Sequence, residues 1–394
     1  MLGFRYNLIV KFSLAILLCG LLLTGCVPGG GFDPGGWAGP TIASVPDEDD
    51  EYKDILFVWS REGELSALDP LDPLDPPKWT FIPEEKSSGG SLFGCTGSSA
   101  PDLVLYGTPK VADGVVYIGS YDGDIYALDA VTGATKWKEI TDGPIVGGPA
   151  VSENVLIVAS GDKVYAFDIA DGYKQIWDEP FDVGGEIWSN PVVVNNIVYF
   201  GSLDHKLYAV DLQTGELAWD EPRNFGVPVN STPLIEDGVL YIGTFDKKFY
   251  ALDAATGESI WDEAYKANDW FWNTAVWSDG TVYVSSLDGS IHAIDAETGN
   301  GRWVKVTTSG EQIRSAPVIV EGVLVVGSKD DRVYGLDPES GMEKWGPLLL
   351  EHDILADPWV EGNIVYLLDR DNNLYAMDAT TGQKETWAPL SLDK

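Results

Sequence analysis

The sequence predicts an all-β protein, an eight-bladed β-propeller whose four-stranded antiparallel blades dock on one another through tryptophans. Three observations lead to this fold class. A pattern of the form Tyr-Ala-Leu-Asp-Ala-x-Thr-Gly-x-x-x-Trp recurs with a period near 42 residues, and eight copies can be aligned. Each copy holds two evident strands and one tryptophan at a nearly constant offset. A repeat of this length and composition is typical of propeller blades.

The aspartate that ends the third strand marks each copy. Its carboxylate can accept hydrogen bonds from backbone N–H groups two residues further on, and the Gly of the following Thr-Gly takes a left-handed turn position. A degenerate first copy ends at Asp69. The seven clear copies end at Asp129, Asp168, Asp211, Asp253, Asp295, Asp337 and Asp378.

Within a copy the four predicted strands follow a constant order. The first strand follows a proline, as at residues 231–235, and the second is an alternating apolar run such as residues 239–243. A tight turn joins the second strand to the third, and the Asp-Gly pairs at residues 122–123 and 288–289 are strong hairpin signals. The first copy lacks a clear first strand, which residues 37–46 would supply.

The fourth strand carries the tryptophan. A large aromatic residue at the same register in every copy is expected to pack between neighbouring blades, because stacked repeats need an interface residue in each unit. The predicted docking residues are Trp79, Trp137, Trp177, Trp219, Trp261, Trp303, Trp345 and Trp387.

This pattern closely resembles the PQQ-like repeat, and the resemblance covers residues 55–394. The PQQ-like repeat family includes quinoprotein alcohol dehydrogenases and the BamB lipoproteins of the outer-membrane β-barrel assembly machine. The resemblance therefore implies the eight-bladed propeller fold. It implies little about function, because the shared residues are those that build the blades.

Residues 1–25 are predicted to be a signal peptide. Two basic residues, Arg5 and Lys11, precede an apolar run at residues 12–23, which is too short to span a bilayer comfortably. The run ends in Leu-Thr-Gly-Cys, which resembles the lipobox of bacterial lipoproteins, and this resemblance implies lipidation of Cys26. The alternative is a retained signal anchor with an incidental cysteine.

A lipidated Cys26 would place the protein outside the cytoplasm, anchored to a bacterial membrane through lipid only. Residue 27 is valine rather than aspartate. The lipoprotein family rule then favours the outer membrane where the host has one, and otherwise the outer face of the cytoplasmic membrane. Residues 26–54 are rich in glycine, proline and acid, and we expect a flexible spacer there, with the propeller at residues 55–394.

One insertion departs from the repeat. Residues 84–105 are rich in serine and glycine and are predicted to form a mobile loop or a second contact element. This segment holds Cys95, which stands alone in the expected mature chain, because Cys19 leaves with the signal peptide and Cys26 is lipidated. No intramolecular disulfide is then expected, so stability has to come from blade packing and ring closure.

The chain is strongly acidic, with 62 acidic against 25 basic residues and a formal net charge of −37. This charge repels nucleic-acid phosphates and anionic lipid surfaces, so neither is expected as a partner, and the lipid anchor has to hold the protein at the membrane. Basic partners, divalent cations or a salty habitat would each account for the acidity. We expect a monomeric propeller.

The two ends of the propeller are expected to differ in charge. Turns between the second and third strands share one end with the links between blades, and they hold Arg61, Lys163, His205, Lys206, Lys247, Lys248, Lys329, Arg332 and Arg370. Turns between the first and second strands lie at the other end and hold Asp113, Glu153, Glu236, Asp237, Asp279, Glu321 and Glu361. These latter turns hold no lysine or arginine, and solubility would explain their acidity.

The links between blades contain the candidate binding site. When the copies are aligned on the proline that precedes the first strand (alanine in one copy), the residue three positions earlier differs from copy to copy. It is Tyr106, Val146, Trp188, Asn230, Trp272, Arg314 and Leu355. A position that varies while its neighbours stay constant is not needed to build the blade. These side chains are expected to ring the mouth of the central channel, where propeller ligands commonly bind.

The residues predicted to bind a partner or ligand at this mouth are Tyr106, Trp188, Asn230, Trp270, Trp272 and Arg314. Tryptophan and arginine dominate protein interfaces, and tryptophan also stacks on sugar rings. The aromatic segment at residues 265–277 is the first choice for a contact loop. The alternative is that Trp188 and Trp272 only plug the channel.

No catalytic site is predicted. The sequence shows no Ser-His-Asp arrangement, phosphate-binding loop or dinucleotide fingerprint, and its three histidines have no metal-ligand spacing. Residues 369–373 partly resemble a calcium loop, but Leu374 stands where a glycine is needed. Quinoprotein dehydrogenases hold their cofactor with Ca²⁺, a catalytic aspartate and often a disulfide between adjacent cysteines. This chain has no such cysteine pair, so PQQ with Ca²⁺ is kept only as an alternative cofactor.

Together these features predict a lipid-anchored, extracytoplasmic scaffold without catalytic activity. It would bind another envelope protein through the propeller mouth and would be BamB-like in architecture. One alternative is a PQQ- or quinone-binding protein, or the relic of such an oxidoreductase. The other is a glycan-binding module that uses the mouth tryptophans.

Overall fold

The computed structural model describes residues 26–27, 30–31, 38–46, 52–60, 63–83, 106–385 and 387–392. The predicted signal peptide, much of the predicted spacer, and the insertion with Cys95 lie outside these residues. The chain divides into two compact units, Met1–Gly35 and Gly36–Lys394. In the first unit, β1 (Cys26–Val27) pairs with β2 (Gly30–Gly31) in antiparallel register.

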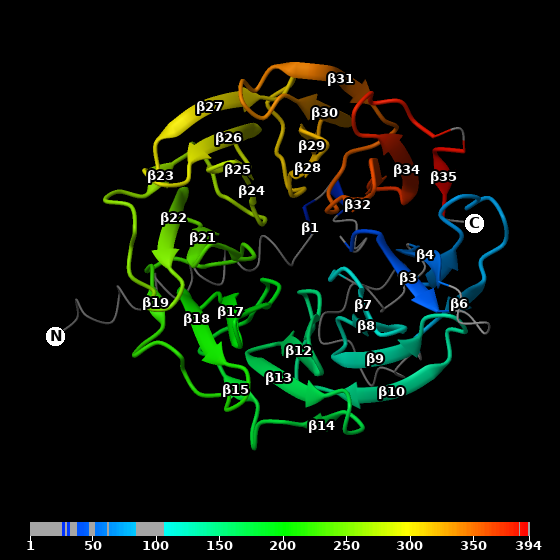
Figure 1. Cartoon of the computed structure of the whole chain (residues 1–394), viewed down its shortest axis with the longest axis vertical. Helices are drawn as coiled ribbons and strands as arrows, with labels where there is room; N and C mark the ends of the chain where they lie inside the picture. Colours follow the sequence, from blue (N-terminus) through cyan, green and yellow to red (C-terminus); the bar gives the residue numbers. More distant parts are fainter. Residues whose placement is uncertain are drawn as a thin grey trace. The chain divides into compact units, whose positions relative to one another are not determined.

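The second unit is the predicted eight-bladed β-propeller (Figure 1). Each blade is an antiparallel sheet whose strands follow in chain order from the central axis to the outer rim. In the third blade the outer strand is split into two short pieces that both pair with the strand inside them. The described residues contain no helix that is long and apolar enough to cross a membrane.

The strands of the first four blades are β3 (Thr41–Pro46), β4 (Tyr52–Trp59), β5 (Leu65–Leu68) and β6 (Trp79–Phe81); β7 (Lys110–Ala112), β8 (Val115–Gly119), β9 (Asp124–Asp129) and β10 (Thr135–Ile140); β11 (Ala150–Ser152), β12 (Val155–Ser160), β13 (Lys163–Asp168), β14 (Lys174–Gln175) and β15 (Phe181–Asp182); and β16 (Val192–Val194), β17 (Ile197–Gly201), β18 (Lys206–Asp211) and β19 (Arg223–Asn224).

The strands of the last four blades are β20 (Leu234–Glu236), β21 (Val239–Gly243), β22 (Lys248–Asp253) and β23 (Tyr265–Lys266); β24 (Val276–Ser278), β25 (Thr281–Ser285), β26 (Ser290–Asp295) and β27 (Gly301–Val306); β28 (Val318–Val320), β29 (Val323–Gly327), β30 (Arg332–Leu336) and β31 (Glu343–Leu349); and β32 (Trp359–Glu361), β33 (Ile364–Leu368), β34 (Asn373–Asp378) and β35 (Leu390–Ser391).

The core lies between blades rather than within one. The second strand of a blade is buried along almost its whole length, as in β12 and β29, because neighbouring blades cover both of its faces. A typical core layer combines Tyr283 and Ile291 of the sixth blade with Leu324 and Val326 of the seventh. Each blade therefore depends on its neighbours to bury its apolar residues.

The ring closes between the first and last blades without strand exchange. β3 is the inner strand of the first blade and pairs with β4 from Thr41 to Pro46, so residues 37–46 do supply the missing strand. β3 lies within residues 26–54, the range predicted as spacer, and the propeller therefore includes part of that range. Ile42 joins a core layer with the eighth blade, and the Thr41 hydroxyl donates to the Pro109 carbonyl of the second blade at 2.9 Å.

Tryptophans dock successive blades as the repeat pattern suggested. In six of the eight cases the indole Nε1 donates a hydrogen bond to a carbonyl of the next blade. The pairs are Trp79–Ala130, Trp177–Leu212, Trp219–Ala254, Trp261–Ala296, Trp303–Pro338 and Trp345–Ala379, with distances from 2.6 to 3.0 Å. Trp137 instead stacks on Tyr173 at 4.6 Å, and Trp387 packs into the core layer between the eighth and first blades.

In the same six cases the indole lies against the glycine of the Thr-Gly turn of the next blade, which is Ser-Gly in the seventh blade. A Cβ atom added at Gly215 would lie 2.7 Å from the Trp177 ring, and one at Gly341 would lie 2.7 Å from the Trp303 ring. Both glycines also have positive φ angles, 72° and 68°. Glycine is therefore required here for its backbone conformation and for the space that the indole occupies.

We expect removal of β3 to destabilise the whole ring. Truncation of the N-terminus through Pro46 exposes the partners of Ile42 and Val45, and burial of each of these side chains contributes about 1.5–3 kcal/mol. The melting temperature, followed by circular dichroism, should fall markedly. A protein that begins at Gly36, where the second unit starts, is the control and should melt like the longer chain. Equal melting temperatures for the two truncations would show that β3 does not close the ring.

Substitution Trp219→Ala should lower the free energy of unfolding by about 3–5 kcal/mol, because it empties an interblade contact and removes one of the two donors to the Ala254 carbonyl, the other being the Tyr199 hydroxyl. Trp219→Phe keeps part of the packing and should cost less. Guanidinium unfolding measures both. Leu71→Ala, at a side chain that is 89% exposed, should leave stability unchanged. A loss of less than about 1 kcal/mol in Trp219→Ala would contradict the docking role.

Candidate functional site

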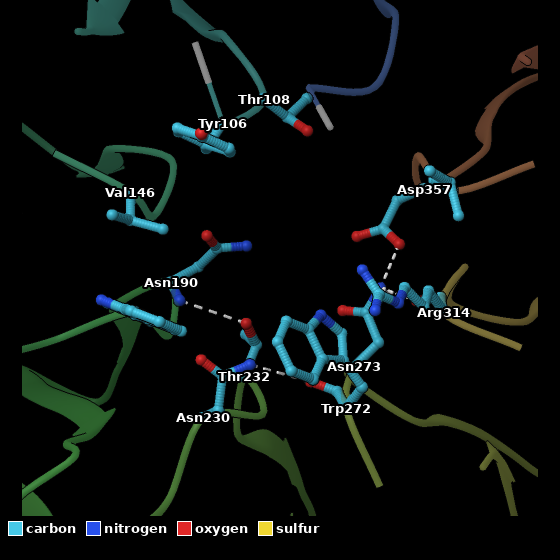
Figure 2. Close-up of a pocket in the computed structure, with 12 residues that line it drawn as sticks. Tyr106, Thr108, Val146, Asn190, Asn230, Thr232, Trp272, Asn273, Arg314 and Asp357 are labelled. Carbon is cyan, nitrogen blue, oxygen red and sulfur yellow. Dashed lines mark hydrogen bonds between the residues drawn. The ribbon is translucent and has the colours of Figure 1, made fainter. Parts of the chain in front are cut away.

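The seven variable link residues line one cavity at the mouth of the channel, together with a second row of side chains below them. Those seven are Tyr106, Val146, Trp188, Asn230, Trp272, Arg314 and Leu355, and the second row is Thr108, Asn190, Thr232, Asn273 and Asp357. Figure 2 shows Asp357, Asn273 and Arg314 together on one side, and Tyr106 and Val146 on the opposite side. The seven link residues that align three positions before the first-strand proline therefore come from seven blades and meet at one cavity.

A buried serine fixes the direction of several of these side chains. Ser189, which follows Trp188, accepts a hydrogen bond from the Gly201 backbone N–H at 2.8 Å and donates one to the Gly201 carbonyl at 3.0 Å. Ser231, which follows Asn230, makes the same pair of bonds with Gly243. These two links are therefore tied to the end of the second strand of their own blades, and the residue before each serine lines the mouth.

The second row forms a partial belt of hydrogen bonds between blades. In four places the backbone N–H of the residue before the proline position donates to the side chain at the same position of the next blade. The pairs are Gly39–Thr108 at 3.0 Å, Gly148–Asn190 at 2.7 Å, Asn190–Thr232 at 3.2 Å and Ala316–Asp357 at 2.8 Å. The sequence analysis missed these residues, although oxygen-bearing side chains directly before the proline were a visible signal.

Trp270 was predicted for the mouth ring, but it does not line the cavity. Its ring stacks on Phe245, with the centroids 4.4 Å apart and the planes at 5°, and Phe245 also lies 6.0 Å from Trp272. Phe245 belongs to the turn between the second and third strands of the fifth blade. The three rings form an aromatic shelf, which we define as Phe245, Trp270 and Trp272, beside the cavity. The sequence pattern predicted Trp270 and Trp272 at the mouth but did not indicate Phe245.

Arg314 is the cation of the mouth. Its guanidinium lies over the Trp272 ring, 5.2 Å from the centroid, where a cation is attracted by the electrons of the ring face. Burial lowers the pKa of Arg314 from its usual value, and the nearby charge of Asp353 opposes that shift. A desolvated arginine on an aromatic face is a typical hot-spot arrangement in protein interfaces.

Asp357 is the carboxylate of the mouth. It accepts hydrogen bonds from the Ala316 backbone N–H at 2.8 Å and from the Asn273 side-chain amide. Burial of the carboxyl raises its pKa to about 6, although both hydrogen bonds favour the charged form. Asn273 also donates to the Arg314 carbonyl at 2.9 Å, so this amide links the sixth, seventh and eighth blades.

Several basic residues on the mouth side are paired with nearby aspartates. Lys206 lies 3.2 Å from Asp204 and Lys248 pairs with Asp246 in their own turns, whereas Lys163 lies 2.6 Å from Asp142 of the link before its blade. The aspartates of these turns often also accept a bond from the tyrosine of the third strand, as in Asp204 with Tyr208 and Asp330 with Tyr334. The predicted mixed charge of this end is therefore mostly neutralised locally.

At the opposite end, backbone geometry explains part of the acidity. Asp113, Glu153, Asp237, Asp279 and Glu321 all have positive φ angles between 47° and 50°. They stand at the first central position of two-residue hairpin turns, and in four of these turns the glycine that follows also has a positive φ. Aspartate tolerates that conformation better than most residues, so the turn geometry accounts for Asp113, Asp237 and Asp279, while the two glutamates are left to the effect on solubility.

The partial calcium loop of the last blade is a structural turn. Both oxygens of Asp369 are used inside the turn, by the backbone N–H groups of Asp371 and Asn373, the Asn373 amide and the Tyr375 hydroxyl. The described residues contain no group of three or more histidine, cysteine or acidic side chains arranged to hold a metal. His292 is buried and contacts the Tyr265 hydroxyl at 3.0 Å, as expected for a packing role.

The mouth does not fit PQQ with Ca²⁺, the cofactor of the dehydrogenases that share the repeat. The cavity measures about 80 Å³, whereas pockets for small molecules are usually about 300–1,000 Å³. Its one carboxylate, Asp357, already accepts two hydrogen bonds. Both observations concern the residues at the mouth, and neither favours enclosure of a planar cofactor there.

Comparison with known proteins shows which family this chain matches and which proteins it resembles. The family model described as outer membrane protein assembly factor BamB matches residues 61–263 and 315–391. A protein of that name from Alteromonas naphthalenivorans is 29% identical over 114 residues, which cover 28% of this chain and 27% of the relative. The chain thus matches about a quarter of that relative's length. A lanthanide-dependent methanol dehydrogenase from Methylacidiphilum fumariolicum is 32% identical over 123 residues, 28% of this chain and 19% of the enzyme.

A solved structure of BamB from Moraxella catarrhalis superposes with a TM-score of 0.65 at 19% sequence identity. The superposition covers 86% of this chain and 98% of that structure. At this identity the likeness establishes the shared propeller fold and does not assign any residue of the mouth.

Asp357 should make stability fall with rising pH. Its pKa is raised from 3.8 in the unfolded chain to about 6 in the fold, so the folded state binds more protons between these values. The stability conferred by the protonated carboxyl is present at low pH and is lost as pH rises through about 6. Asp357→Asn cannot titrate, so its stability relative to wild type should rise by about 2 kcal/mol between pH 4.5 and pH 7.5. Urea unfolding at both pH values measures this difference.

Asp295→Asn is a control that should not respond in this pH range. Hydrogen bonds from Arg302 and Thr298 lower the pKa of Asp295 to about 2, so its contribution is fully present above the unfolded pKa of 3.8 and is lost only as pH falls toward about 2. The stability of this variant relative to wild type should therefore be nearly the same at pH 4.5 and pH 7.5. If Asp357→Asn is equally insensitive to pH, the pKa of Asp357 is not raised in the fold.

Proposed function

The chain belongs to the family of outer membrane protein assembly factor BamB, and from this premise we propose that it is a scaffold without catalytic activity. It holds another protein of the cell envelope against the mouth of its propeller. Relatives of that name are assembly factors for outer membrane proteins, which supports an extracytoplasmic location and an envelope partner. The partner is a component or client of such assembly.

The observation that carries this proposal is the composition of the mouth. Trp188, Trp272 and Arg314 stand at a link position whose residue differs from blade to blade, so blade construction does not need these side chains. These three residues nevertheless line one cavity beside the aromatic shelf. Tryptophan and arginine are enriched in the buried centres of interfaces, where they supply most of the binding energy.

A buried acceptor at the mouth supports the same proposal. Asn230 is 7% exposed, and its Oδ1 atom has no hydrogen-bond partner among the described residues. A buried oxygen without a donor is uncommon in native structures and needs water or a ligand to satisfy it. A donor from a docked partner would satisfy it while the aromatic shelf excludes water.

The proposal includes the lipid anchor. Cys26 follows the lipobox-like Leu-Thr-Gly, and lipid is needed because a net charge of −37 opposes adsorption to anionic membranes. Two or more acyl chains would give stable anchoring, whereas one chain binds only marginally. With Val27 after the cysteine, the outer membrane is the proposed site where the host has one.

Affinity capture from the detergent-solubilised envelope of the native host tests the scaffold role. The wild-type protein is compared with the triple variant Trp188→Ala, Trp272→Ala, Arg314→Ala, after circular dichroism has shown unchanged folding. We expect an envelope protein to be retained by the wild type and reduced at least about tenfold by the variant, since loss of one hot-spot residue already costs about 2 kcal/mol.

The matched control is Leu217→Ala, Ile260→Ala, Met342→Ala. These three apolar side chains are exposed and lie outside the residues that line the mouth cavity. The control should retain the partner at the wild-type level. If both triple variants retain it equally, the mouth is not the docking site. If the wild type retains no envelope protein, the scaffold proposal itself fails.

A further inference from the structure

The outer edges of the eight blades are protected to very different degrees. An outer strand leaves one row of backbone N–H and C=O groups without a partner strand, and proteins usually protect such edges with prolines, charges or short strands. In the fourth and fifth blades the outer strands β19 and β23 have two residues each. Asp-Glu pairs follow the docking tryptophan in the third, fourth and fifth blades, with a proline next in the first two of these.

Two longer outer strands, β31 and β10, are also protected. β31 contains Pro347, and its register with β30 is interrupted there. β10 carries Lys136 and Lys138, and lysine is a common protective residue at edges. The remaining outer strands, β6 and β35, have three and two residues.

β27 of the sixth blade lacks part of this protection. It contains no proline and pairs with β26 continuously from Trp303 to Val306. It carries Arg302 and Lys305, but the residue after its docking tryptophan is Val304, where β10 has Lys138. Figure 1 shows β27 along the outer rim, outside β26. The strand is therefore regular and has no protein strand on its outer side among the described residues.

Two apolar side chains of β27 face outward from the protein core. Val304 is 50% and Val306 is 56% exposed, and the period of a strand places them on the same face. The opposite face is covered, because Trp303 docks on the seventh blade through Pro338 and Lys305 pairs with Glu343 at 2.7 Å. The two valines thus lie on the face toward the fifth blade.

The fifth blade does not cover these valines, because its outer strand is too short. Tyr265, the first residue of β23, lies against Gly301 at the start of β27 and contacts His292 through its hydroxyl. Beyond this contact, Val304 and Val306 remain exposed. Exposed β-branched side chains beside an open row of backbone groups are the surface that an added strand needs.

We propose that β27 is a second docking site, which binds an extended segment of another polypeptide as a fifth strand of the sixth blade. Backbone hydrogen bonds to the free edge hold the segment, and its alternate side chains pack on Val304 and Val306. This site is independent of the propeller mouth and of the partner proposed there.

The acidic charge of this protein indicates which residue types an added strand should contain. The two cations of β27 are already neutralised, since Arg302 pairs with Asp295 at 2.7 Å and Lys305 pairs with Glu343. The whole chain carries a net charge of −37. An incoming strand with basic residues between apolar ones is therefore favoured, both in its encounter with the protein and after docking. The same charge opposes pairing of β27 with a second copy of this chain.

Binding of a fluorescent peptide of alternating valine and lysine tests this site by anisotropy, at about 0.15 M and about 0.5 M salt to separate strand pairing from long-range attraction. The variant Val304→Glu, Val306→Glu gives a clear discrimination. It makes the surface more acidic, so non-specific attraction would strengthen binding, whereas loss of the apolar strand contact should weaken it at least about tenfold. A peptide with N-methyl groups on alternate amides should also bind at least about tenfold more weakly.

Ile140→Glu, at a 62% exposed position of β10, is the matched control and should bind like the wild type. Unfolding curves check that all variants remain folded. Tighter binding by the double variant, or equal binding of the N-methylated peptide, would overturn the proposal. Sedimentation that shows a wild-type dimer broken by Val304→Glu, Val306→Glu would overturn the assignment to a foreign strand and give the edge to a second copy.

Discussion

The contact of an indole with the Thr-Gly turn of the next blade is the interaction on which the rest of this structure depends. In six blades the tryptophan donates to a carbonyl of its neighbour and lies on a glycine that has no Cβ to obstruct it. A single four-stranded blade cannot bury both of its faces, so stability belongs to the pairs of blades. The repeated tryptophan, glycine and aspartate are the parts of each pair.

Closure of the ring follows from the same logic. β3 provides the inner strand of the first blade, and Ile42 and Trp387 share a core layer, so the first and last blades meet as any other neighbours do. The docking tryptophan makes a different contact at two junctions. Trp387 packs in the core layer that closes the ring, and Trp137 stacks on Tyr173 rather than donating to a carbonyl. The shorter repeat spacing between Asp129 and Asp168 accompanies that difference.

Because the same tryptophan contact docks most pairs of blades, residues at other positions of the repeat can differ from blade to blade. At the mouth, Ser189 and Ser231 tie their links to their own blades, while the residue at the position before them ranges from valine to tryptophan to arginine among the links. The outer rim shows a similar freedom, since some edges are short or carry proline and β27 presents two exposed valines. A symmetric framework thus presents two surfaces that are not symmetric, and both lie where blade packing places no demand on the side chain.

The sequence by itself determined the number of blades, their strand order, the docking tryptophans and the ring of link residues, because each of these is a local pattern repeated at one period. It also indicated that residues 37–46 could supply a strand. Only the tertiary structure decided that Trp270 stacks on Phe245 outside the cavity, that Asn273 and Asp357 join three blades, and that Val304 and Val306 are left uncovered. These features depend on contacts between residues that lie far apart in the sequence, such as Asn273 and Asp357, which are 84 positions apart. A repeat pattern specifies what each blade contributes, but the space left between unlike neighbours depends on how all of them pack.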